Sequence, residues 1–280
     1  MTNAPLKVSS KFPNGYGDFA IQSSDDVVCY FPGPILTHTS TVFRDMFEMP
    51  SPEAKEDALV KITEPINILE AFLAHLDPNA LTPLIDPDTI KGLLCMADKY
   101  QVTKILLWFK QEATLRRSDL EAKTVGAPFV ITHPILCLSI ATRLNFKHIG
   151  RIALRELSTC SSQVFLNCIA QLNPLMLHYL YQLRNHRITL YQAYVAKLTE
   201  ISEKGCEYCS GPRAEWIRKF VISIQDTPSW AKFKEAFNKG TKMSCRRCGT
   251  CWSAVFSDKI PVWEKEARQE DSKFPDWPLD

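Results

Sequence analysis

Residues 18–47 read DFAIQSSDDVVCYFPGPILTHTSTVFRDMF, and this stretch decides the fold of the first third of the chain. Two short runs, Phe19–Ile21 and Val27–Phe31, are rich in β-branched and aromatic residues. The segment between them, Ser23–Asp26, consists of residues that favour turns, so the three pieces together predict a β-hairpin. The prolines of Pro32–Pro34 predict the end of the second strand.

A helix is predicted shortly after the hairpin, and either Ser40 or Thr41 suits its N-cap. Its apolar residues recur at offsets of three and four, which places them on one face: Val42, Phe43, Met46 and Phe47. We therefore predict that Phe43 and Phe47 are both core residues beneath the hairpin.

The pattern continues with a third strand at Leu59–Ile62 and a helix that begins near Pro65. The apolar stripe of this helix comprises Leu69, Phe72, Leu73 and Leu76. Two further helices follow, with the apolar faces Ile90, Leu93, Leu94, Ala97 and Val102, Ile105, Leu106, Phe109. Because the two are separated by a short connection, they predict a helical hairpin.

This order of elements resembles the BTB/POZ domain, and it is most similar to fungal members of that family. The segment Phe43–Phe47, FRDMF, followed by the acidic, proline-containing stretch Met49–Asp57, carries the resemblance. The family's aspartate matches Asp18. The chain departs from the pattern at Pro32, where many BTB domains carry a histidine, so the resemblance does not extend to a charged pocket built on Asp18.

The resemblance implies an α+β domain over residues 16–117 that mediates protein–protein interaction and associates with itself through its helical face. Several BTB classes recruit a cullin-type ubiquitin ligase scaffold. The implied function is that of an adaptor or scaffold, and a ubiquitin-ligase substrate adaptor is one such role. The alternative is a BTB-containing transcriptional regulator whose cysteine-rich segment contacts DNA.

Composition bounds these expectations. The chain has 280 residues, 45% hydrophobic and 23% charged, which is ordinary for a soluble globular protein of one or two domains. Residues 1–12 contain no apolar signal segment, and no apolar run is long enough to span a membrane. Ten cysteines in such a chain favour a reducing compartment, so we expect the cytoplasm or nucleus.

Five segments follow from these patterns. Residues 1–15 are a loose lead-in, 16–117 the BTB/POZ-like domain, 118–203 a helical extension, 204–256 a cysteine-rich segment and 257–280 a C-terminal tail. Residues 118–132 read as a linker or loop, and the pattern is helical from Pro134 to about Ser202. This extension is similar to the three-box or BACK-like helical regions that often follow BTB domains.

The cysteines of the fourth segment form two C-x-x-C knuckles, Cys206–Cys209 and Cys245–Cys248, separated by 35 residues. Two such turns supply the four thiolates of a tetrahedral Zn²⁺ site. Cys251 is an alternative ligand. Residues 214–237 between the knuckles read as two helices broken at Thr227–Pro228, so we expect a structural zinc that pins two helices together. Redox chemistry and inert thiols are the alternatives.

The remaining cysteines, Cys29, Cys95, Cys137, Cys160 and Cys168, lie in or beside apolar patterns and are expected to be small buried side chains. The sequence contains no H-E-x-x-H pair, glycine-rich phosphate loop or G-x-S-x-G element, so no catalytic residue is predicted. Residues 204–251 carry 10 basic and 4 acidic side chains, which raises nucleic-acid binding as a question. No helix shows a dense basic face, and we do not expect nucleic acid as the partner.

Overall fold

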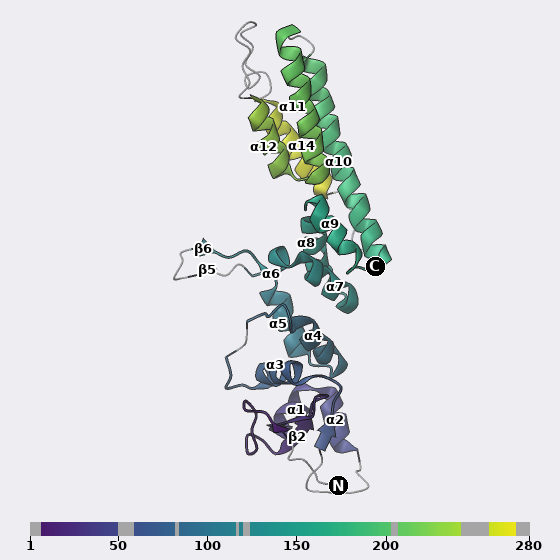
Figure 1. Cartoon of the computed structure of the whole chain (residues 1–280). Helices are drawn as coiled ribbons and strands as arrows, with labels where there is room; N and C mark the ends of the chain where they lie inside the picture. The colour runs from purple at the N-terminus through teal and green to yellow at the C-terminus, as the bar shows by residue number, and fades with distance from the viewer. Residues whose placement is uncertain are drawn as a thin grey trace. The chain divides into compact units, whose positions relative to one another are not determined.

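A computed structural model of the chain describes residues 7–49, 59–81, 84–115, 118–119, 124–202, 207–241 and 258–272. Within these ranges the protein is a mixed α+β structure that is mostly helical (Figure 1). The chain divides by its internal contacts into two compact units, residues 1–136 and residues 137–280. Each unit is described by itself.

The first unit contains a four-stranded sheet in the order β1-β3-β2-β4. Its strands are β1 (Lys7–Val8), β2 (Phe19–Gln22), β3 (Val27–Phe31) and β4 (Leu59–Lys61). Strands β2 and β3 form the predicted antiparallel hairpin, with Ile21 opposite Cys29. At its turn, Asp26 adopts the left-handed backbone conformation, with φ of 61°. Aspartate tolerates this conformation better than most residues, which explains the turn at this point.

A pair of helices follows the hairpin, α1 (Gly33–Thr39) and α2 (Thr41–Glu48). The carboxylate of Asp18 accepts a hydrogen bond from the backbone N–H of Gly33 at 2.7 Å, which satisfies a free donor at the start of α1. Helix α1 was not predicted, because the prolines of Pro32–Pro34 indicate the end of a strand at least as readily as the start of a helix. Proline is compatible with the first turn of a helix, and Pro34 occupies that place.

Ser40 is the N-cap of α2, as one of the two predicted alternatives. Its Oγ accepts a hydrogen bond from the N–H of Phe43 at 3.1 Å and donates one to the carbonyl of Tyr100 at 2.6 Å. The cap therefore also fixes α2 to a residue sixty positions later. The Phe43 ring stacks on the Tyr100 ring at 4.9 Å between centroids and is fully buried, as predicted.

Phe47 corrects the prediction. Phe47 is 43% exposed, although its ring lies 4.5 Å from that of Phe19. Helix α2 ends one residue later, at Glu48. An offset of four places Phe47 on the same helical face as Phe43. Phe47 lies in the last turn of α2, at the edge of the core, where fewer side chains cover it.

The rest of the first unit is formed by α3 (Ile66–Leu76), α4 (Ile90–Lys99) and α5 (Thr103–Glu112). The predicted stripes of these helices are buried, and Leu106 alone among them is only partly covered. Beyond α5 lie β5 (Ser118–Asp119) and β6 (Thr124–Val125), a short antiparallel pair, and then α6 (Phe129–Thr132). Neither this pair nor α6 was predicted, because the segment is rich in turn residues.

The second unit consists of helices in the described residues, and α7 begins just before its boundary. They are α7 (Pro134–Leu144), α8 (Lys147–Ser158), α9 (Ser162–Ile169), α10 (Pro174–Ser202), α11 (Glu207–Asp226), α12 (Trp230–Thr241) and α14 (Lys259–Ser272). The break between α11 and α12 falls at Thr227–Pro228, as predicted. In Figure 1, α10, α11, α12 and α14 run side by side as a bundle.

An aromatic core holds this bundle together. Its buried members come from four helices: Tyr191, Tyr194, Val195, Leu198, Phe220, Ile224, Phe233, Phe237, Trp263 and Ala267. Trp263 stacks on Tyr194 with 5.2 Å between ring centroids. Helix α14, which supplies Trp263, lies in the segment that the sequence analysis described only as a C-terminal tail. Most residues of α14 are polar, so its two core residues, Trp263 and Ala267, do not form a recognisable apolar stripe in the sequence.

Candidate functional site

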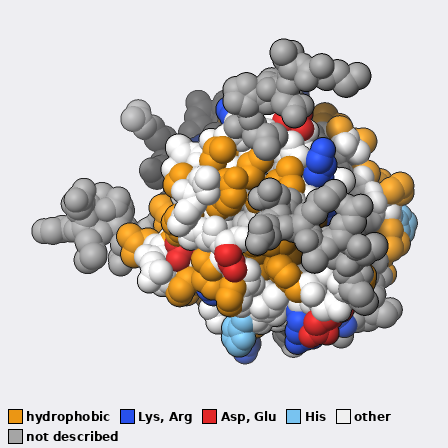
Figure 2. All heavy atoms as spheres, turned by 90° about the horizontal axis from the view of Figure 1, so that it is seen from below, with side chains coloured by type: hydrophobic (Ala, Val, Ile, Leu, Met, Phe, Trp, Pro, Cys, Tyr) orange, Lys and Arg blue, Asp and Glu red, His pale blue; other side chains and the backbone are white. Residues whose placement is uncertain are grey.

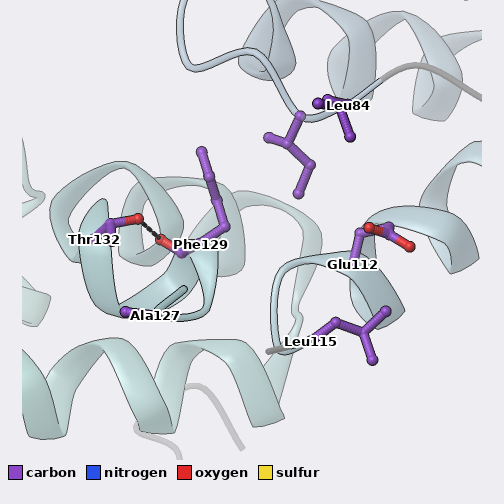
Figure 3. A pocket seen from close by; sticks show the side chains of 7 residues that line it. Leu84, Glu112, Leu115, Ala127, Phe129 and Thr132 are labelled. Carbon is purple, nitrogen blue, oxygen red and sulfur yellow. Dashed lines mark hydrogen bonds between the residues drawn. The ribbon is translucent and has the colours of Figure 1, made fainter. Parts of the chain in front are cut away.

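An apolar cleft of about 200 Å³ opens in the first unit, between three segments that are distant in sequence (Figure 3). Leu84 and Ile85 precede α4, Glu112 and Leu115 lie at the end of α5, and the third wall is formed by Ala127, Phe129 and Thr132. Glu112 is the only lining residue with an ionisable side chain, so the cleft suits contact with an apolar group rather than acid–base chemistry.

Helix α6 is fastened to the end of α5. The N–H of Val130, a buried residue, donates to the carbonyl of Ala113 at 3.0 Å. The ring of Phe129 lies 6.4 Å from that of Phe109 and stacks on His133 at 4.5 Å. These contacts orient one wall of the cleft.

The opposite wall is positioned by Asp86, which organises the turn before α4. Its carboxylate accepts hydrogen bonds from the Thr89 hydroxyl at 2.7 Å and from the N–H of Asp88 at 3.2 Å. These donors lower the pKa of Asp86, with the Thr89 bond as the largest cause. These hydrogen bonds hold the backbone at Asp86, which directly follows the lining residues Leu84 and Ile85.

Two of the apolar side chains that line this cleft are exposed. Leu84 is 67% exposed and Leu115 is 49% exposed. Scattered exposed apolar residues are normal, but their gathering beside a cleft is typical of an interaction surface. Neither leucine was predicted as a site residue. For Leu84, the sequence signal is its position in the turn-rich stretch from Leu81 to Asp88, outside any periodic pattern.

A second surface lies over α1 and α2. An open hollow of about 610 Å³ there is lined by Pro34, Thr37, His38, Arg44, Phe47 and Glu48. Phe47 and Met49 are 43% and 66% exposed. Figure 2 views this end of the first unit and shows hydrophobic side chains gathered across the face, with charged side chains scattered among them.

The predicted metal ligands fall mostly outside the described residues. This holds for Cys206, Cys245, Cys248 and Cys251. Cys209 belongs to the first turn of α11, although its side chain is not among those described. Within the described ranges, no group of three or more His, Cys, Asp or Glu residues could hold a metal ion.

The other five cysteines are free thiols. Cys29, Cys137 and Cys168 are buried as predicted, whereas Cys95 and Cys160 are partly exposed. Burial raises the pKa of Cys29 to about 11 and that of Cys137 to about 12. Thiols with such pKa values are protonated at neutral pH and are poor nucleophiles.

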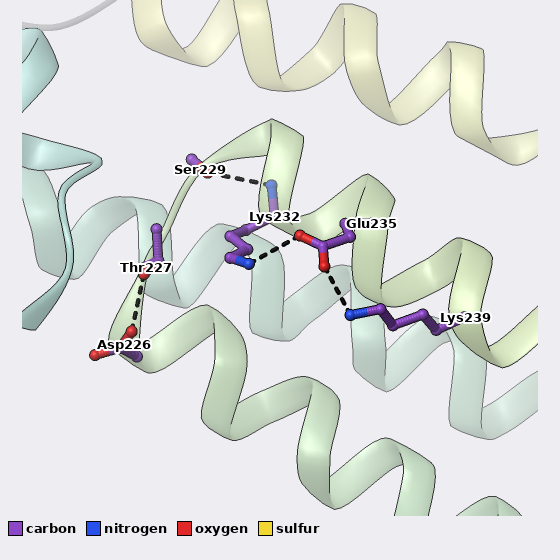
Figure 4. Close-up of polar contacts among 6 residues, drawn as sticks. All are labelled: Asp226, Thr227, Ser229, Lys232, Glu235 and Lys239. Carbon is purple, nitrogen blue, oxygen red and sulfur yellow. Dashed lines mark hydrogen bonds and ion pairs between the residues drawn. The ribbon is translucent and has the colours of Figure 1, made fainter.

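The basic residues of α11 and α12 are largely matched by acidic ones. Arg218 and Lys219 both lie within 3.2 Å of Glu215. On α12, Glu235 accepts from Lys232 at 2.8 Å and from Lys239 at 2.7 Å (Figure 4). Such pairing along each helix leaves a surface of mixed charge, which does not favour binding to a phosphate backbone.

A comparison with models of known protein families finds no family that matches this chain, and a comparison with curated proteins finds no matching sequence. None of the helices in the described ranges combines the length and the apolar character that crossing a bilayer requires.

Proposed function

We propose that this protein is a protein–protein interaction adaptor built on a BTB/POZ-type domain over residues 16–117. The observation that carries the proposal is the apolar cleft with its exposed leucines, Leu84 and Leu115. A surface of this kind gains free energy when a partner removes it from water.

The order of elements supports the BTB/POZ part of the proposal. The hairpin β2–β3 is followed by the helical pair α1–α2, strand β4, helix α3 and the helices α4 and α5. The family resemblance rests on the same order of hairpin, helix, strand, helix and helical hairpin. The FRDMF segment falls in α2, where Phe43 enters the core.

A cullin-type scaffold is the proposed partner of the cleft. Burying a leucine side chain contributes roughly 1.5–3 kcal/mol. Leu84 is 67% exposed and Leu115 is 49% exposed, so burying both against apolar side chains of a partner contributes free energy that favours specific binding.

The experiment measures binding of the 280-residue chain to a purified cullin-type scaffold protein by isothermal titration calorimetry. Leu115→Ser is expected to weaken binding about tenfold or more, since each 1.4 kcal/mol corresponds to a factor of about ten. Leu107→Ser is the matched control, because Leu107 on α5 is 52% exposed but does not line the cleft. An equal loss of affinity in both variants would show that the cleft is not the binding site. If the unaltered chain does not bind, a cullin-type scaffold is not the partner.

A further inference from the structure

The bundle presents an aromatic face to α14, formed by Tyr191 and Tyr194 of α10 and Phe233 of α12. We propose that this docking face binds an amphipathic helix of a partner protein, and that α14 is its displaceable occupant. The partner helix carries a tryptophan, a small residue one turn later and acidic residues along one edge. The proposal concerns the second unit and is independent of the cleft and of the adaptor function proposed for it.

The docking face belongs to a core that is held together without α14. Between ring centroids, Phe233 lies 5.5 Å from Tyr191 on α10 and 5.0 Å from Phe220 on α11. Trp230 also stacks on Phe233, at 5.1 Å. These contacts join α10, α11 and α12, and α14 takes no part in them. We therefore expect the face to keep its shape when α14 leaves it.

Helix α14 meets the docking face through one large side chain. The ring of Trp263 stacks on Tyr194 at 5.2 Å and meets Phe233 edge-on at 6.3 Å, so it packs against two helices at once. Ala267, four positions later, lies on the same side of the helix and is also buried. A buried tryptophan of this kind is a typical anchor for a helix that docks on a preformed apolar surface.

The other contacts of α14 are weaker. Ile260 is only partly buried against the core, and Val262, next to the anchor, is 50% exposed. Towards the end of the helix, Glu270 lies 3.8 Å from the Nε2 atom of His186 on α10, whose side chain is 47% exposed. An ion pair with this exposure contributes little to stability. The attachment of α14 therefore depends mainly on its tryptophan.

The fit of α14 leaves one polar group of the docking face unsatisfied. The hydroxyl of Tyr194 is buried and makes no hydrogen bond of good geometry within the described residues. Burial raises the pKa of Tyr194, and the nearby carboxylates of Glu266 and Glu270 raise it further. A buried donor without an acceptor costs free energy. A partner helix whose carboxylate accepts this hydrogen bond would fit the face better than α14 does.

The charges beside the docking face specify the acidic edge of the partner. On α10, the ammonium group of Lys197 lies 5.7 Å from the centroid of the Tyr194 ring, and His186 lies beside Glu270. On α14, Glu266 and Glu270 follow the tryptophan by three and seven positions, which places them along one edge of its buried face. Opposite charges of this kind favour one orientation of a docked helix.

Covalent attachment explains why the face is occupied by α14. Helix α12 ends at Thr241 and α14 begins at Lys259 of the same chain. A tethered helix competes at an effective concentration on the order of 1 mM. A partner at lower concentration displaces it only by binding more tightly, so α14 acts as an autoinhibitory helix. Removing the side chain of Trp263 weakens this competitor and leaves the docking face itself unaltered.

The test adds a fluorescein-labelled peptide with the sequence of residues 259–272 to the 280-residue chain and measures fluorescence anisotropy. The Trp263→Ala chain should bind the peptide at least about tenfold more tightly than the unaltered chain. Val262→Ala is the matched control, because it changes an exposed neighbour of the anchor and should bind as weakly as the unaltered chain. A peptide carrying Trp263→Ala should not bind, and one carrying Glu266→Gln and Glu270→Gln should bind more weakly.

A folded Trp263→Ala chain that does not bind the peptide would overturn the docking site. A dimer of this variant that excess peptide leaves intact would show that a second copy, rather than a partner helix, occupies the face. Hydrogen exchange of the unaltered chain keeps the test decisive if the variant does not fold. Amides of α14 should exchange at least about tenfold faster than those of residues 190–198, and equal rates would overturn the displaceable role of α14.

Discussion

The guanidinium of Arg184 donates a hydrogen bond to the backbone carbonyl of Asp226, with 2.6 Å between Nη2 and the oxygen. Arg184 lies on α10 and Asp226 ends α11. The same side chain donates to the carbonyl of Cys160 at 2.6 Å and to that of Gln225 at 3.1 Å. Arginine is thus used here to satisfy carbonyl groups at the ends of two other segments, since the last carbonyls of a helix have no partner within it.

Replacing Arg184 should destabilise the second unit. Arg184→Met leaves carbonyls at two segment ends without their donor, and we expect a loss of about 2–4 kcal/mol in the free energy of unfolding. Arg184→Lys should recover only part of this, because an ammonium group lacks the planar fork. Urea unfolding followed by tryptophan fluorescence measures the effect. Arg155→Met, at an exposed position, is the control and should change stability by less than about 0.5 kcal/mol.

Phe43 and Phe47 should differ sharply although they share a helical face. Phe43→Ala should cost about 3–5 kcal/mol, because it leaves a cavity against Tyr100 in a closed core. Phe47→Ala should cost less than about 1 kcal/mol, because the ring is already 43% exposed. Far-UV circular dichroism during urea unfolding compares the two. Equal losses would contradict the placement of Phe47 at the core edge.

His75 should make the first unit less stable in acid. It is buried, its Nδ1 donates to the carbonyl of Ala71 at 2.8 Å, and its Nε2 has no partner within the described residues. Burial lowers the pKa of His75 from its usual 6.5, so the unfolded chain takes up the proton first. Stability contributed by the neutral ring is therefore complete above the unfolded pKa and is lost as pH falls through the folded pKa.

Thermal unfolding between pH 8 and pH 5 measures this dependence. His75→Gln, which cannot titrate in this range, should flatten the decline below about pH 6.5. His148→Gln is the control, because His148 is exposed on α8 and should leave the slope unchanged. A slope that is the same in all three proteins would exclude His75 as its origin.

Self-association should depend on the surface over α1 and α2. If Phe47 and Met49 form part of a contact between copies, Phe47→Glu should shift the full chain from dimer to monomer in light scattering at ~100 μM, a concentration well above the Kd of a specific dimer. Val262→Glu on α14, where Val262 is 50% exposed, is the control. A monomeric unaltered chain at this concentration contradicts the prediction, and so does a dimer that Phe47→Glu leaves intact.

Much of the local structure could be predicted from the sequence, because its causes are local. The turn at Ser23–Asp26, the cap at Ser40 and the break at Thr227–Pro228 follow from the chemistry of a few adjacent residues. The buried stripes of α3, α4 and α5 follow from the helical period. Predictions failed where a local rule has two outcomes: the prolines of Pro32–Pro34 follow the end of β3 at Phe31, but they also suit the N-cap and first turn of α1, which begins at Gly33.

The sequence by itself determined the elements and the stripes that they bury, together with the two C-x-x-C knuckles. Only the tertiary structure decided that Phe47 is exposed, that Trp263 enters the bundle core, and that Leu84 and Leu115 line the same cleft. The physical reason is that periodicity specifies a face of a helix but neither its partner nor the place where its core ends. Those depend on contacts between segments tens of residues apart, such as Arg184 with Asp226, which no local pattern encodes.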